Sequence, residues 1–483
     1  MWKLSWVSLV CAVAFAVAAN AQGTNPCAVP SAFPHSDVGI GANKVACTLP
    51  QLYGRQGLVF PPNGDLGPID QHPNIGTDFS TATKQQELVN ASINSNVAGQ
   101  IALLPFVAPA SGITFTFDKS LFIYTESPDS FGPIFSERAS TIGRHRLSVG
   151  VAYQYLDFDS LGGINLHSFP TTFLQAPTSE PNCPASDVFS FRCLQTHDYV
   201  TATNRIDLTI HQITSFVTFG LTRNIDISVA VPYVRVQMSA IADARIAENG
   251  GGTEFAGCNG VLGDCGLQNT FSNARHAAGI GDVTLRAKGT IRRWERASLA
   301  AGIDVRIPTG SAINLLGAGA VGIKPFGVWS YGGRISPHVN LAYQWNGKSI
   351  LGADVTTGGK GSLPSQFLYS VGLEAAIKKR LTATLDLIGQ RIFNAPVDTL
   401  VPITVPSVCN PSITVGNKCL DVGAQSTTIG VSTGDYWIHN GNIGLRLRPF
   451  GKLLITGSVL LKLDNGGLRS KAIPLASATY TFN

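Results

Sequence analysis

Hydrophobic and polar residues alternate one by one along the larger, C-terminal part of the chain. The clearest example is the stretch 279–310, in which two alternating runs, 283–291 and 299–307, flank a short turn. In the first run, for example, Leu285 is followed by Arg286. Successive side chains of a strand point to opposite faces, so the stretch predicts a β-hairpin with one apolar and one charged face. The apolar face could meet the core of a soluble sandwich or the lipid of a membrane.

The alternation recurs often enough to predict twelve strands. They are expected at about 144–155, 205–219, 225–233, 283–291, 299–307, 321–331, 334–345, 366–377, 381–391, 436–448, 452–463 and 475–482. Short turns near 221, 293, 333, 379 and 450 alternate with long segments near 180, 260, 315, 355, 410 and 468. Outer-membrane barrels show this sorting, with short periplasmic turns, long outer loops and strands of about 9 to 11 residues. The predicted fold is therefore all-β, a transmembrane up-and-down antiparallel β-barrel of about 12 strands.

The second expected strand changes its apolar parity partway along. Positions up to Ile210 carry the pattern at first, and Ile213 and Val217 carry it afterwards. An extra residue in one strand shifts the alternation by one position, so we expect a β-bulge near His211 or Gln212.

Aromatic residues near the expected strand ends fit the same fold, because amphipathic rings form girdles at the headgroup level of membrane barrels. They are Tyr153, Tyr155, Tyr233, Trp329, Tyr331, Tyr343, Trp345, Tyr369, Trp437, Tyr480 and Phe482.

The N-terminal third does not show the strand pattern. Residues 1–21 carry Lys3, an apolar core and an Ala-x-Ala ending, which together predict a secretory signal peptide rather than an uncleaved anchor. Residues 22–142 are rich in Pro, Gly and Asn. They contain a helix-compatible stretch at about 80–104 and a short alternating run at 113–119. This region is expected to be a plug in the lumen, a periplasmic extension or a loosely ordered leader, and residues 143–483 are expected to form the barrel.

Eight cysteines beyond the leader fall into four close pairs, which in a secreted chain predicts disulfides. The expected pairs are Cys27–Cys47, Cys183–Cys193, Cys258–Cys265 and Cys409–Cys419. None has the spacing of a zinc site, so no metal or cofactor is expected.

Charge and composition narrow the class of function. Charged residues make up 13% of the chain, and its formal net charge is +5, too small to indicate a nucleic-acid partner. No interior stretch reaches the roughly 18 apolar residues of a membrane-spanning helix. The expected partners are outer-membrane lipid and the barrel-assembly machinery, and the sequence does not indicate an oligomeric state.

Five segments resemble a family of outer-membrane transporters associated with the MetA pathway of phenol degradation. They are 131–143, 279–289, 304–320, 336–347 and 473–482. That family is similar to the long-chain fatty-acid channels of the outer membrane. The resemblance implies a bacterial outer-membrane location and passive uptake of small hydrophobic or aromatic solutes, and it brings no established binding residues.

If the apolar parity faces lipid, the opposite parity lines the lumen. The candidates there are Arg286, Lys288, Asp304, Arg306, His338, Asn340, Glu374, Asp386, Arg446 and Arg448. These residues either guide the polar end of a solute and tune ion selectivity, or pair with one another and stabilise the barrel interior.

Two other classes of function compete with a channel. An outer-membrane phospholipase needs a serine, a histidine and an acid or amide within hydrogen-bond reach. His338 with Asn340 and His439 with Asn440 are the pairs to consider, and the sequence places no serine against either, so we expect no enzyme. A structural or adhesive barrel with disulfide-braced loops is the third possibility.

Overall fold

The computed structural model describes most of the expected barrel and parts of the region before it. The described residues are 27, 44–52, 92–98, 115–118, 123–126, 131, 134–174, 199–247, 267–355, 357–405, 414–415, 418–419 and 424–482. The expected signal peptide and Cys183, Cys193, Cys258, Cys265 and Cys409 lie outside them.

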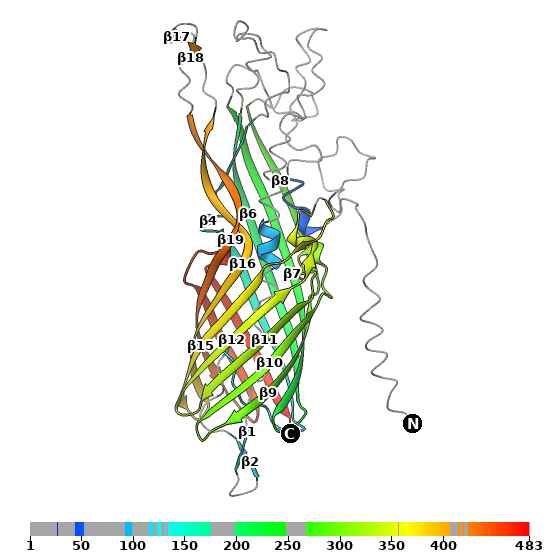
Figure 1. Cartoon of the computed structure of the whole chain (residues 1–483), viewed down its shortest axis with the longest axis vertical. Helices are drawn as coiled ribbons and strands as arrows, with labels where there is room; N and C mark the ends of the chain where they lie inside the picture. The colour runs from blue at the N-terminus through cyan, green and yellow to red at the C-terminus, as the bar shows by residue number, and fades with distance from the viewer. Residues whose placement is uncertain are drawn as a thin grey trace, which may run out of the picture.

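Twelve antiparallel strands form a closed ring, in which each strand pairs with the next one along the chain (Figure 1). β3 closes the ring because it pairs with both β22 and β6. The ring consists of β3 (Leu147–Leu161), β6 (Tyr199–Gly220), β7 (Ile225–Ala247), β9 (Val283–Arg293), β10 (Ala297–Ile307), β11 (Gly322–Tyr331), β12 (Ile335–Asn346), β15 (Ser365–Lys378), β16 (Leu381–Val405), β19 (Ala424–Leu447), β20 (Leu453–Lys462) and β22 (Ala472–Phe482). The predicted twelve-stranded up-and-down barrel is confirmed.

The wall is apolar outside and polar inside. On β10, Ile303 is 41% exposed, whereas the next residue, Asp304, is 4% exposed. The same contrast between an exposed apolar residue and a buried polar one separates Leu285 from Lys288 on β9. A soluble barrel would bury the apolar set, so this exterior is built for contact with lipid.

The expected bulge on β6 is wrong. β6 pairs with β7 along its whole length without a register shift, and its side chains alternate strictly through His211 and Gln212. The apolar positions nevertheless change face: Ile213 and Val217 point outward, whereas Ile210 is buried inside. The change has a simple explanation if the strand stays regular as it leaves the bilayer. Inside the bilayer its outward side chains are apolar because they face lipid. Above the bilayer its inward side chains are apolar because they face a buried core.

The change of face occurs at the same level on three neighbouring strands. Tyr155 of β3 lies opposite His211 of β6, and His211 lies opposite Arg235 of β7. Tyr153 and Tyr233 lie one outward-facing position below this line. We call the outward apolar surface between this line and the short turns the apolar belt. On β6 it spans about nine residues, the length that a tilted strand needs to cross a bilayer.

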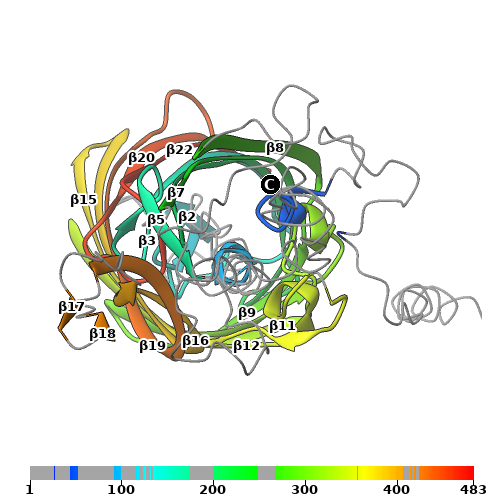
Figure 2. The same cartoon turned by 90° about the horizontal axis from the view of Figure 1, so that it is seen from above.

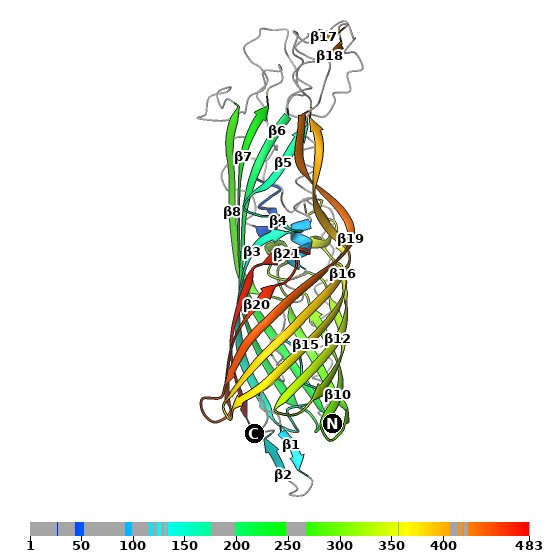
Figure 3. The same cartoon turned by 90° about the vertical axis from the view of Figure 1, so that its left-hand side faces the viewer.

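Above the apolar belt, several strands continue far beyond the expected boundaries (Figure 3). The long segment predicted near 260 is partly strand, because β7 continues to Ala247 and β8 (Gln268–Ile280) pairs with its upper half. β16 and β19 also pair well past the belt. The limit of about 9 to 11 residues applies only to the part of a strand in lipid, so pairing can continue outside it.

Small strands complete the described part of the chain. β4 (Ile164–Asn165), β5 (Phe169–Leu174) and β21 (Leu468–Ser470) join the main sheet; β13 (Lys348–Ser349) pairs with β14 (Gly361–Ser362), and β17 (Thr414–Val415) pairs with β18 (Lys418–Cys419). β5 reaches β19 through Thr172, whose hydroxyl lies 2.8 Å from that of Ser426. The outer edge of β8 pairs with no strand among the described residues.

Parts of the N-terminal region lie within the barrel. A short helix, residues 92–98, stands in the lumen when the barrel is viewed from above (Figure 2). The 3-10 turn η1 (Val45–Cys47) is buried, and a disulfide joins Cys27 to Cys47. The hairpin of β1 (Phe115–Asp118) and β2 (Ile123–Glu126) instead forms a separate sheet beyond the short-turn end (Figure 1). Helix 92–98 is shorter than the stretch 80–104 expected from sequence, whose other residues lie outside the described part.

Candidate functional site

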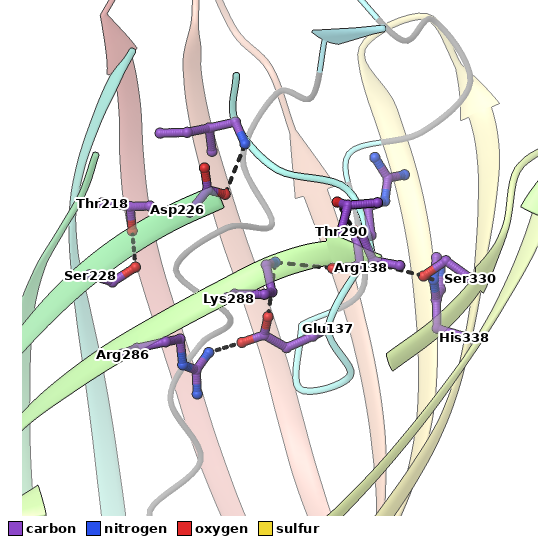
Figure 4. A network of polar contacts seen from close by, with 12 residues as sticks. Glu137, Arg138, Thr218, Asp226, Ser228, Arg286, Lys288, Thr290, Ser330 and His338 are labelled. Atoms are coloured by element: carbon purple, nitrogen blue, oxygen red, sulfur yellow. Dashed lines mark hydrogen bonds and ion pairs between the residues drawn. The ribbon is translucent and has the colours of Figure 1, made fainter. Parts of the chain in front are cut away.

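Residues 134–142, which we call the inner segment, cross the lumen just before the chain enters β3. Their contacts follow the order of the wall strands from β16 to β7, and Figure 4 shows those with β11, β9 and β7. The contacts are Ser136 N to Asp386 Oδ1 (3.4 Å), Arg138 Nη2 to Glu374 Oε1 (2.6 Å), Ala139 N to Ser330 Oγ (2.9 Å), Thr290 Oγ1 to Ala139 O (2.7 Å) and Ile142 N to Asp226 Oδ2 (2.9 Å). The inner segment therefore lies along the inside of the wall, near the short turns.

Glu137 of the inner segment is held by two cations of β9. Its carboxylate pairs with Arg286 and, at 3.1 Å, with the Nζ of Lys288. Arg286 also donates to both carboxylate oxygens of Asp304, at 2.6 and 2.7 Å. Lys324 reaches the same Asp304 carboxylate at 3.0 Å. One chain of charges thus links the inner segment to β9, β10 and β11.

Arg138 anchors the other side of the inner segment. Its Nε and Nη2 donate to Glu374 Oε1 of β15, at 2.9 and 2.6 Å. His338 Nε2 lies 2.6 Å from the same oxygen, and His338 Nδ1 lies 2.9 Å from Ser330 Oγ. The expectation that no serine lies against His338 is therefore wrong, because pairing of β11 with β12 brings Ser330 opposite it.

This serine, histidine and glutamate contact is enclosed. Ser330, His338 and Glu374 are all buried, and the Ser330 hydroxyl also accepts a hydrogen bond from Ala139 N. The carboxylate of Glu374 is shared with Arg138. In this arrangement the three side chains tie two wall strands to the inner segment, and no ester can approach the hydroxyl while the segment is in place.

Three other predicted residues lie on β16 and β19 or just past them. Asp386 accepts a hydrogen bond from Asn442 at 2.9 Å, besides its contact with Ser136 N. Arg446 donates to Phe131 O at 2.8 Å. Arg448 lies one position beyond β19, with its guanidinium 5.4 Å from the centre of the Phe131 ring. All three thus contact the chain around the inner segment or the inner segment itself.

The last two predicted residues differ in their surroundings. Arg306 lies 3.6 Å from Asp282, in the bend between β8 and β9, and donates to Asn346 at 2.9 Å. Asn340, with its amide turned to satisfy both of its polar atoms, accepts from Ser370 Oγ and from the backbone N–H of Glu137. All ten predicted lining residues therefore face inward or toward the lumen end, and each has a partner among the described residues.

The ion-pair network around the inner segment joins the acids Glu137, Asp304 and Glu374 to the bases Arg138, Arg286, Lys288 and Lys324. Hydrogen bonds of Asp226, Asp386 and Arg446 to backbone groups extend it. Burial of one charge without its partner costs about 3–5 kcal/mol, whereas removal of both partners can be nearly neutral. The network therefore holds the inner segment firmly as long as every partner is present.

An apolar contact holds the start of the inner segment. Ile134 and Phe135 pack in one buried cluster with Phe216 of β6, Leu460 of β20 and Leu475 of β22. These strands lie on the side of the barrel that the ion-pair network does not reach. Burial of each such side chain contributes about 1.5–3 kcal/mol, so the segment is fixed to both sides of the wall.

Helix 92–98 is attached higher in the barrel, above the apolar belt. Ser92 donates its hydroxyl hydrogen bond to Asp398 Oδ2, and Tyr436 donates to Asn96 at 2.6 Å. The other Asp398 oxygen has no hydrogen-bond partner in the described part of the chain. Burial with a single hydroxyl partner raises the pKa of Asp398 to about 6, because it disfavours the charged form.

The network also contains residues that the sequence did not single out: Glu137, Arg138, Lys324 and Ser330. Lys324 and Ser330 have inward parity on β11, and the periodic pattern could have identified them. Glu137 and Arg138 lie in a stretch without periodicity, and their only signal was membership of the resembling segment 131–143.

Within the described residues, no cluster of three or more His, Cys, Asp or Glu side chains could hold a metal ion. No helix among them is long and apolar enough to cross a membrane.

Comparison with known proteins gives structural neighbours only. No protein-family profile and no curated sequence matches the chain. Solved structures of similar shape include an outer membrane channel from Pseudomonas putida F1, with 11% identity, 71% of this chain and 98% of that chain covered and a TM-score of 0.35. They also include the TodX monoaromatic hydrocarbon channel (9% identity, 79% and 99% covered, TM-score 0.32) and a Pseudomonas aeruginosa FadL homologue (9%, 71% and 91%, TM-score 0.27). The resemblance to the phenol-degradation transporters stays a prediction.

Proposed function

We propose that the chain is a passive outer-membrane channel for small hydrophobic or aromatic solutes, with residues of the 22–142 region acting as a plug. The observation that carries the proposal is the wall itself: a closed strand ring with an apolar belt outside and a polar lumen occupied by the inner segment. Such a wall holds a polar path across lipid, and the inner segment controls how much of that path is open.

The solute class is supported by the upper part of the barrel. Above the apolar belt, the inward residues of β6 and β7 are apolar apart from Asn204, as Leu208, Val236 and Met238 illustrate. They form one buried cluster with Ile93 and Val97 of helix 92–98. A solute that replaces the helix there would exchange water for apolar side chains, which favours hydrophobic and aromatic molecules.

Uptake by whole cells tests this proposal directly. Cells that carry the chain in a lipopolysaccharide-containing outer membrane are expected to take up a labelled monoaromatic compound several-fold faster than cells without it. Met238→Asp, which places a charge in the apolar cluster, is expected to reduce that uptake. Gln237→Asp changes the neighbouring outward residue and serves as the matched control. Equal uptake with and without the chain would contradict the proposal.

Planar-bilayer recording tests the plug separately. The wild-type chain is expected to show low conductance, because the inner segment occupies the lumen. Conductance should rise when the ion pairs of the inner segment are weakened. A wild-type conductance equal to that of a variant lacking residues 22–142 would contradict the assignment of a plug.

A further inference from the structure

The short-turn end of the barrel carries a ring of positive charge that the channel proposal does not use. We call these residues the basic rim: Arg144, Arg223, Arg292, Arg296, Arg334, Lys378, Lys379, Arg380 and Lys452. Each of the five short turns carries at least one of them. Within these turns, Glu295 is the only acidic residue.

Several cations of the basic rim have no carboxylate beside them. Above the apolar belt, some exposed cations do have such partners, as in the pairs Arg205–Asp207 and Arg391–Asp435, both at 3.2 Å. On the basic rim, Arg296, Arg334 and Lys379 are exposed and form no ion pair with a described carboxylate. The rim therefore presents a net positive field to whatever surrounds it.

The apolar belt places this charge at the edge of the bilayer. Trp294 and Phe450 lie in two of the short turns and are exposed, as is Ile291 just above the first of them. The guanidinium of Arg292 lies 5.2 Å from the centre of the Trp294 ring. Exposed aromatic rings mark the level of lipid headgroups, so the neighbouring cations lie at the level of the phosphates.

The ring shape distinguishes between possible partners. Successive short turns follow one another around the barrel, since the strands pair in sequence order. A protein partner would dock on one side and need a one-sided patch. Lipid surrounds a barrel completely, and a complete ring of cations matches it. We infer that the basic rim binds the phosphates of anionic phospholipids, such as phosphatidylglycerol, in the leaflet at the short-turn end.

Tryptophan quenching in reconstituted vesicles tests this inference. The full chain is placed in phosphatidylethanolamine vesicles that contain either brominated phosphatidylglycerol or brominated phosphatidylcholine. The Trp294 signal is the difference between the chain and its Trp294→Phe variant. At low salt we expect phosphatidylglycerol to be preferred over phosphatidylcholine beside Trp294 by about fivefold, as judged from the quenching. This is the preference that roughly one nearby cation produces. The preference should fade at high salt, because screening weakens interactions between exposed charges.

Two variants with equal loss of charge separate the rim from the rest of the surface. The rim variant is Arg296→Gln, Arg334→Gln, Lys378→Gln and Lys379→Gln. The control is Arg205→Gln, Arg235→Gln, Arg245→Gln and Lys471→Gln, four exposed cations from the opposite end. In the rim variant, the ratio of phosphatidylglycerol to phosphatidylcholine preference is expected to approach one. In the control variant, this ratio is expected to stay unchanged.

Several outcomes would overturn the inference. No preference in the wild type at low salt, or the same loss in both variants, would do so. Competition by inorganic phosphate at matched ionic strength would point to a free anion, and rim-dependent binding of polyglutamate in the absence of a lipid preference would point to an acidic macromolecule. If the rim variant does not show the gel shift of a folded barrel, the pair Lys378→Gln and Lys379→Gln and the salt dependence of the wild type take its place.

Discussion

Replacement of Arg138 by Ala is expected to release the inner segment without unfolding the barrel. Arg138 is 7% exposed, and its partner Glu374 is 0% exposed. Two of its nitrogens donate to Glu374, at 2.9 and 2.6 Å. The variant leaves Glu374 buried beside His338 without the hydrogen-bonded guanidinium of Arg138, which costs about 3–5 kcal/mol. Because 1.4 kcal/mol is tenfold in an equilibrium constant, the detached population should rise by roughly a hundred- to several thousand-fold.

Thiol labelling of Ser136→Cys measures that population. Ser136 is fully buried in the inner segment, so a cysteine there reacts with a maleimide only when the segment detaches. We expect slow labelling with wild-type Arg138 and labelling faster by two orders of magnitude or more with Arg138→Ala. The chain without the Ser136→Cys change gives the background from its other cysteines. Single-channel conductance should rise in parallel.

Two controls make the result decisive. Arg296→Ala removes an exposed arginine of the short turns and should leave labelling unchanged. Arg138→Met combined with Glu374→Gln removes both charges and should restore most of the protection, as expected for a buried pair. If labelling stays slow in Arg138→Ala while the barrel remains folded, the ion pair does not hold the segment and the reasoning fails.

Three further predictions concern other parts of the chain. The raised pKa of Asp398 is about 6, so attachment of helix 92–98 should be strongest below the ordinary carboxyl pKa and should weaken as the pH rises through about 6. Hydrogen exchange of the helix, measured as a function of pH, tests this. Asp398→Asn should abolish the pH dependence. Reduction of the N-terminal disulfide should destabilise residues 44–52 by about 3 kcal/mol, visible as faster proteolysis there with an unchanged gel shift of the barrel. Val229→Arg, within the apolar belt of β7, should lower the free energy of folding into vesicles by about 2–4 kcal/mol, whereas Ser239→Arg, on the same face above the belt, should leave it nearly unchanged. Urea titrations of both variants measure the difference. Equal costs would show that the boundary of the belt is assigned incorrectly.

The barrel could be predicted from the sequence because lipid imposes a local rule on every strand. On β10, for instance, Ile303 and Asp304 alternate because one faces lipid and the other the lumen. That rule needs no knowledge of distant contacts. The parity change at His211 shows where this rule ends. Within the bilayer the apolar positions of the strand face outward, and beyond it they face inward, so the same alternation indicates the opposite orientation.

The inner segment could not be predicted in the same way. Contact between Arg138 and Glu374 joins residues 236 positions apart, and no periodicity marks Arg138. The inward parity of Glu374 and His338 did indicate that they face the lumen. It could not show that Ser330 and the inner segment would enclose them, since that depends on strand register and on the path of a nonperiodic stretch.

Closure of the ring between β3 and β22 restricts the order of assembly. The inner segment leads directly into β3, so it is synthesised before any wall strand and is tethered to one side of the seam. Threading a charged stretch into a finished cylinder would require it to pass the rim with its side chains unpaired. It is simpler for the strands to gather around the stretch while the seam is still open, so that its arginine and glutamate pair with the wall as it closes. On this route the wild-type barrel is sealed around its own occupant.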